Sequence, residues 1–189
     1  MEPAFYARSS IHVARDLLGC VLLRDHAADG LVAGRIVETE AYTGLDDPAS
    51  HAAARIGRTY RNDPLFGPPG TAYVHLNYGI HWCLNAVAEP EGVPAGVLIR
   101  ALEPLVGEDT MRRRRSGRAD LTNGPGRLTQ AFAVGPEFQR HRLDTAPLRI
   151  CPGEPVPDRH VARSPRIGIS RAADLPYRFT DNRSPWLTC

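Results

Sequence analysis

The chain has 189 residues, 42% hydrophobic and 23% charged, which is an ordinary globular composition with enough residues to bury one complete core. The formal net charge is only +2, so charge alone does not indicate a nucleic-acid partner. No apolar run reaches the length of a membrane span, and the N-terminus has no signal-peptide core. We therefore expect a soluble, cytoplasmic protein and exclude a membrane protein.

The basic residues and the cysteines narrow the chemistry. All 23 basic residues are arginine. Without a lysine, only the N-terminal amine could form a Schiff base with a sugar aldehyde, so covalent amine catalysis is nearly excluded. The four cysteines contain no Cys-x-x-Cys pair, which argues against a thiolate metal site or a redox motif. We expect reduced structural thiols, no catalytic metal and no cofactor.

In the first third of the chain, the pattern predicts a helix followed by two antiparallel strands. Residues 10–18 carry an apolar helical face that stops at a glycine. A short apolar strand over 20–24 leads through an Asp-Gly turn to a β-rich run over 31–42. A helical turn is expected over 49–55.

The rest of the chain predicts more strands with helices at the edges. Two alternating runs, 71–76 and 80–88, flank a tight turn and predict a β-hairpin. Further strands are expected over 96–102, 148–151, 166–170 and 177–180, and helices over 105–116 and 127–134. The fold class is one mixed α/β (α+β) domain over residues 1–189: a curved antiparallel sheet with a protruding β-hairpin and peripheral helices.

The strand over 31–42 carries the first candidate for chemistry. Glu38 and Glu40 are two residues apart, so on an extended strand they share one face with Tyr42. A carboxylate beside an aromatic ring at a strand end suits general-base chemistry on a flat substrate. The alternative is a solvated face, which is the usual place of a Glu-x-Glu pair. Arg100, inside an apolar run, needs a buried partner such as Glu40.

Two more features have alternative interpretations. Tyr78 is predicted at the hairpin tip, where an exposed ring indicates function; alternatively, the ring folds back onto its own strand. Residues 112–115 are four consecutive arginines, which form either a solvated helix end or a phosphate contact.

Taken together, these motifs resemble the alkyladenine (3-methyladenine) DNA glycosylase family over most of the chain. The resemblance is carried by ordered blocks at compatible spacings, at residues 35–42, His51, 69–74, 78–79, 83–85, 98–104, 123–125, 166–169 and 184–186. It implies an enzyme that flips a damaged purine out of duplex DNA and hydrolyses its N-glycosidic bond, leaving an abasic site. The implied lesions are 3-methyladenine, 7-methylguanine, hypoxanthine and ethenoadenine.

The resemblance also implies residue roles, position by position. Glu40 is expected to activate water as the general base, and Arg100 to help hold that water. The base pocket is expected to be lined by Tyr42, His51, His75, Asn85 and Leu98, with Asn85 clashing with the exocyclic amine of an undamaged guanine. DNA contacts are expected from Tyr78, which fills the gap left by the flipped base, and from Asn77, Gly79, Arg58 and Arg61.

One position departs from the family pattern, because His75 stands where the family usually stacks a tyrosine. Imidazole offers a smaller face and can be protonated, so we expect a changed substrate range and an unchanged reaction. The absence of lysine predicts a monofunctional enzyme without strand cleavage. We expect double-stranded DNA as the partner, a monomer, and no obligatory protein partner.

Two rival functions remain at this stage. One is a non-catalytic nucleic-acid-binding module with a fold like the C-terminal domain of formyltransferases, since fold does not determine function. The other is a small-molecule nucleosidase, which would break the same kind of bond but have no use for an exposed Tyr78.

Overall fold

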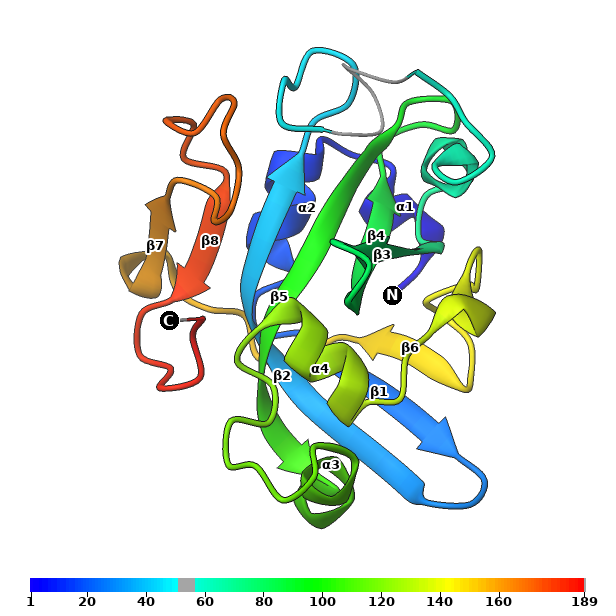
Figure 1. Ribbon diagram of the computed structural model, residues 1–189. Coiled ribbons are helices and arrows are strands. Elements are labelled where there is room, and N and C mark those ends of the chain that lie inside the picture. Colours follow the sequence, from blue (N-terminus) through cyan, green and yellow to red (C-terminus); the bar gives the residue numbers. More distant parts are fainter. Residues whose placement is uncertain (51–56, 189) are drawn as a thin grey trace.

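Strand β2 (Gly30–Tyr42) is the longest element, and the rest of the sheet is built out from its two edges. This computed structural model describes residues 1–50 and 57–188. The eight strands in these residues form one antiparallel sheet (Figure 1). The main path of the sheet runs β3-β4-β5-β2-β1-β6, and β8 pairs with β2 and carries β7. The other strands are β1 (Val21–His26), β3 (Ala72–Asn77), β4 (His81–Ala88), β5 (Ala95–Val106), β6 (Leu148–Cys151), β7 (Val161–Ser164) and β8 (Arg178–Asp181).

Short helices cover the sheet. The α-helices are α1 (Pro3–Tyr6), α2 (Ser10–Asp16), α3 (Glu108–Arg114) and α4 (Pro125–Ala131), and the 3₁₀ turns are η2 (Asp63–Phe66), η3 (Pro136–Phe138) and η4 (Asp158–His160). Helix α2 packs on β2 and β5, and α4 packs on β4 and β5. The hydroxyl of Thr39 donates to the α2 carbonyl of Ala14 at 2.7 Å. Because neighbours on a strand point to opposite faces, α2 covers the face opposite to Glu40.

The β2–β5 pairing is irregular near the centre of both strands. The register pairs Glu38 with Ala101 and Thr39 with Ile99, which leaves Arg100 without a Cα partner. A second skip, between Ile36 and Glu38, leaves out one residue of β2. Such bulges bend the sheet locally and redirect a side chain, and they often lie next to functional sites.

The predicted fold class is confirmed, while several element boundaries differ. The expected helix over 105–116 begins only at Glu108, because β5 continues to Val106 and Gly107 turns the chain with φ +78°. The strand predicted over 166–170 is wrong, and the strand in this region is β7, before Pro165. The helical turn predicted over 49–55 lies largely outside the described residues.

The β3–β4 hairpin is confirmed, with Asn77 opposite His81 and a hydrogen bond from the Ile80 N–H to the Asn77 carbonyl. Tyr78 and Gly79, the central residues, have φ of +51° and +70°. Two positive φ angles are typical of the type I′ turn that matches strand twist. A positive φ is uncommon for an aromatic residue.

The longest α-helices in the described part of the chain have seven residues. No described helix is therefore able to cross a lipid bilayer.

Candidate active site

Three predicted site residues lie on one rung of adjacent strands. Leu98 on β5 pairs with Asn85 on β4 and with Glu40 on β2. Residues directly opposite each other in an antiparallel pair project to the same face. The sheet therefore places these three side chains together, with Tyr42 on the same face two residues beyond Glu40.

Both carboxylates of the Glu-x-Glu pair are completely buried, so the solvated-face alternative is wrong. They flank the guanidinium of Arg100: its Nε donates to Glu38 Oε1 at 3.1 Å, and its Nη1 lies 3.3 Å from Glu40 Oε1. The predicted pairing of Arg100 with Glu40 is confirmed. Buried charges are stable only when paired and hydrogen-bonded, and this cluster meets that condition.

Glu40 is held on both oxygens. The Ile167 N–H donates to Oε1 at 2.8 Å, and the Tyr42 hydroxyl donates to Oε2 at 3.0 Å. Burial raises the pKa of Glu40, and the charge of Arg100 and these two hydrogen bonds offset the rise only in part. A carboxylate with a raised pKa is a stronger base when ionised, as general-base catalysis near neutral pH requires.

The Tyr42 ring contacts Arg166, an arginine that the sequence did not assign to the site. The guanidinium carbon of Arg166 lies 4.7 Å from the Tyr42 ring centroid and 5.3 Å from that of Tyr177. Arg166 also forms a fully buried ion pair with Asp47 and donates to the Ala41 carbonyl at 2.8 Å. Residues 166–170 are not a strand, and the Ile167 N–H donates to the Glu40 side chain instead of to a neighbouring strand.

On the other side of the rung, Asn85 contacts His75. The Asn85 Nδ2 donates to the Tyr73 carbonyl at 3.2 Å and lies 3.2 Å from His75 Nδ1. Because a carbonyl only accepts, the atom facing it is the amide nitrogen, and its second hydrogen is available to the imidazole. The His75 ring also stacks on Tyr73, with centroids 5.1 Å apart and 22° between planes. The remaining predicted pocket residue, His51, lies outside the described residues.

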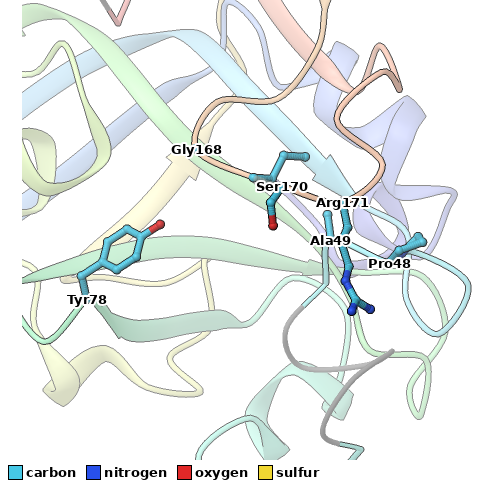
Figure 2. A pocket seen from close by; sticks show the side chains of 7 residues that line it. Pro48, Ala49, Tyr78, Gly168, Ser170 and Arg171 are labelled. Atoms are coloured by element: carbon cyan, nitrogen blue, oxygen red, sulfur yellow. The ribbon is translucent and has the colours of Figure 1, made fainter.

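The predicted DNA contacts lie in two places. Tyr78 is 77% exposed at the hairpin tip, so the alternative of a ring folded onto its strand is wrong. The ring lines a hollow of about 300 Å³ together with Pro48, Ala49 and residues 168–171 (Figure 2). Arg58 and Arg61 are exposed on a separate loop, where Arg58 Nε donates to Asp63 at 2.6 Å.

Arg171, which sequence analysis passed over, lines the same hollow as Tyr78 and is exposed. Figure 2 shows its side chain beside Pro48 and Ala49, with the Tyr78 ring on the other side of the hollow. Its signal in the sequence is weak, because one arginine among 23 basic residues does not stand out.

The consecutive arginines at 112–115 do not form one patch. Arg112 pairs with Glu108, Arg114 with Asp29, and Arg115 with Asp120. Most of this charge is therefore neutralised within the protein.

The described part of the chain holds no cluster of three or more metal-ligating side chains. Burial raises the pKa of the Cys83 thiol, which lies near Arg100 and Glu40, to about 11. A thiol with that pKa is neutral at physiological pH, so the Cys83 side chain packs in the core as a small apolar group.

Comparison with known proteins shows the family of this chain. Residues 4–185 match the family model of methylpurine-DNA glycosylases. A protein of Nitrosospira multiformis is 51% identical over 97% of this chain and 91% of its own length, and one of Salinibacter ruber is 47% identical over 95% and 93%. A third, from Gloeobacter violaceus, is 46% identical over 97% of this chain and 84% of its own. All three are provisionally named 3-methyladenine DNA glycosylases. The chain therefore belongs to the methylpurine-DNA glycosylase family, as its sequence motifs predicted.

Proposed function

We propose that Glu40 and Arg100 hydrolyse the N-glycosidic bond of a damaged purine that has been flipped out of duplex DNA. As a member of its family, the protein is a DNA glycosylase, a hydrolase of N-glycosyl bonds in base-excision repair. The observation that carries the residue assignment is the buried pair itself: the Glu40 carboxylate lies 3.3 Å from the Arg100 guanidinium and also accepts a hydrogen bond from the Tyr42 hydroxyl.

The reaction explains why these groups are needed. Breaking the bond builds positive, oxocarbenium-like charge on the sugar, and Glu40 both stabilises that charge and takes a proton from the attacking water. Arg100 holds the water in line through its remaining N–H groups. A methylated purine already carries positive charge and is a good leaving group, so it needs little protonation.

Recognition of the base is assigned to the five residues that the family resemblance places in the base pocket. Tyr42, His51 and His75 stack on the flipped purine, Leu98 packs beneath it, and Asn85 rejects the exocyclic amine of guanine. The substrate class includes 3-methyladenine and 7-methylguanine, with hypoxanthine and ethenoadenine as neutral members. Extrusion adds selectivity, since damaged or mispaired bases cost less to unstack.

DNA binding is assigned to the exposed hairpin and the arginine loop. Tyr78 enters the minor groove and fills the space left by the flipped base, supported by the turn at Asn77 and Gly79. Arg58 and Arg61 contact the phosphate backbone. We further propose that the protein is a monomer, acts in the cytoplasm and needs no obligatory protein partner. Without lysine, it leaves the abasic strand intact.

Neither rival function fits as well. A pure binding module has no need of two buried carboxylates around one arginine, an arrangement that is costly to desolvate. A nucleosidase for free nucleosides gives no reason for a tyrosine that is 77% exposed on a turn with positive φ.

The test is Glu40→Gln, which keeps the shape of the side chain and removes the base. We expect affinity for abasic-site duplex to be unchanged and the single-turnover rate of base release to fall by about 100-fold or more. Glu103→Gln is the matched control, because Glu103 pairs with Arg35 on the same sheet away from this cluster. Excision by Glu40→Gln at the wild-type rate would overturn the mechanism.

A further inference from the structure

Glu38, the first carboxylate of the pair, has contacts that differ from those of Glu40. Its Oε1 accepts from Arg100 Nε at 3.1 Å and from Arg178 Nε at 2.7 Å, and its Oε2 accepts the Thr188 N–H at 2.6 Å. The side chain is fully buried. All three partners are hydrogen-bond donors, so the side chain at position 38 must supply only acceptors, as an ionised carboxylate does.

We propose that Glu38 is a positioning residue, which fixes the guanidinium of Arg100 so that one edge faces Glu40 and the attacking water. The inference rests on the proposed function, because it assigns Glu38 a purpose only if Glu40 and Arg100 carry the reaction. Glu38 itself touches neither the DNA nor the water in this proposal.

The backbone shows why Arg100 needs such an anchor. Arg100 is one of the residues that the β2–β5 register skips, so no partner on β2 sets the direction of its side chain. The guanidinium is planar, and binding its Nε to Glu38 leaves Nη1 facing Glu40. Two anchors on different nitrogens therefore fix the plane of the group.

Removing the first anchor has a definite chemical consequence. Arginine and a carboxylate prefer a bidentate, fork-to-fork contact. Without Glu38, Arg100 is free to turn onto both oxygens of Glu40, which withdraws N–H groups from the water and lowers the basicity of the carboxylate. Loss of the neighbouring Glu38 charge acts in the same direction, because that charge raises the pKa of Glu40.

Glu38 is held by parts of the chain far away in sequence. Arg178 on β8 also donates through Nη1 to Ser164 at 3.0 Å, and Thr188 lies 150 residues from Glu38. The two carboxylates and two arginines together carry no net charge. The cluster is thus electrically neutral, and replacing one of its carboxylates by a neutral side chain leaves an excess positive charge.

The experiment is Glu38→Gln with Asp181→Asn as the matched control. Asp181 is likewise fully buried and pairs with two arginines, Arg35 and Arg183, but makes no bond to Arg100. Both variants are measured for thermal unfolding, for affinity to abasic-site duplex, and for single-turnover excision across pH. Asp181→Asn controls for the general loss of a buried, paired carboxylate.

For Glu38→Gln we expect unchanged affinity, a rate lower by about 100-fold, and an acid limb of the pH–rate profile moved down by about one pH unit. The other charged or titratable groups around Glu40 stay in place, namely Tyr42 on β2, Cys83 on β4, Arg178 on β8 and Arg166. For Asp181→Asn we expect the wild-type limb. If the acid limb of the pH–rate profile lay at the same pH in both variants, Glu38 would have only a structural role.

Should Glu38→Gln fail to fold, Glu38→Asp decides the matter. It keeps the charge and shortens the reach, so we expect a lower rate with an unmoved acid limb; a wild-type rate overturns the proposal. The two levels of failure are separable. Wild-type excision by Glu40→Gln removes the proposed mechanism, whereas an inactive Glu40→Gln beside a fully active Glu38→Gln removes only this inference.

Discussion

The buried ion pair between Asp47 and Arg166 supports both stability and the active site. Neither side chain is exposed, and Arg166 Nη2 donates to Asp47 Oδ1 at 2.9 Å while Nη1 contacts Oδ2. Asp47→Asn replaces one acceptor with an NH₂ group and leaves a buried cation uncompensated. Removing one partner of such a pair costs about 3–5 kcal/mol.

For a chain of this size, each kcal/mol lowers Tm by about 2–4 °C, so we expect Asp47→Asn to melt about 6–20 °C below the wild type. Excision should also slow at temperatures where the variant is folded, because Arg166 directly precedes Ile167, whose N–H holds Glu40. Thermal unfolding and single-turnover excision measure the two effects. Asp144→Asn, which breaks the surface pair with Arg142, is the control and should leave Tm almost unchanged.

The pH dependence of this Tm difference has a definite sign. Burial disfavours the Asp47 carboxylate, but the hydrogen bonds and charge of Arg166 outweigh burial and lower its pKa in the folded state. A lowered folded pKa contributes stability above the unfolded pKa and loses it as pH falls through the folded value. The difference in Tm between Asp47→Asn and the wild type should therefore become smaller as the pH is lowered into the acid range. If Asp47→Asn at neutral pH lowered Tm no more than the control Asp144→Asn does, the reasoning would be refuted.

Three further predictions concern substrate and DNA binding. Tyr78→Ser should weaken affinity for lesion-containing duplex in titrations, because the exposed ring is lost from the gap; unchanged affinity would mean that the ring has no role in flipping. His75→Tyr should alter the order of excision rates on oligonucleotides with methylated, deaminated and etheno-bridged purines, and an identical order would show that the histidine is silent. Arg171→Gln should reduce the slope of log K against log salt by about 0.9, one phosphate contact, while Arg149→Gln on edge strand β6 should not; equal slopes would contradict a phosphate contact.

Much of the fold was predictable because its signals are local. Alternating apolar residues and a turn predicted the hairpin, and the same turn placed Tyr78 at its tip. The long central strand followed from a β-rich run after an Asp-Gly turn. Even the pairing of Arg100 with Glu40 was accessible, since a lone cation in an apolar strand needs an anion.

The amino-acid sequence by itself determined the family, the strand that carries both carboxylates, and the residue types of the site. Only the tertiary structure decided that the carboxylates are buried, that Arg166 stacks behind Tyr42, and that Glu38 and Glu40 have different partners besides the Arg100 that they share. The reason is distance along the chain: Asp47 and Arg166 are 119 residues apart, and Glu38 and Arg178 are 140 apart. The alternation of apolar and polar residues predicts which face of a strand a side chain occupies. The partner that the side chain contacts on that face depends on how segments far apart in the sequence pack together.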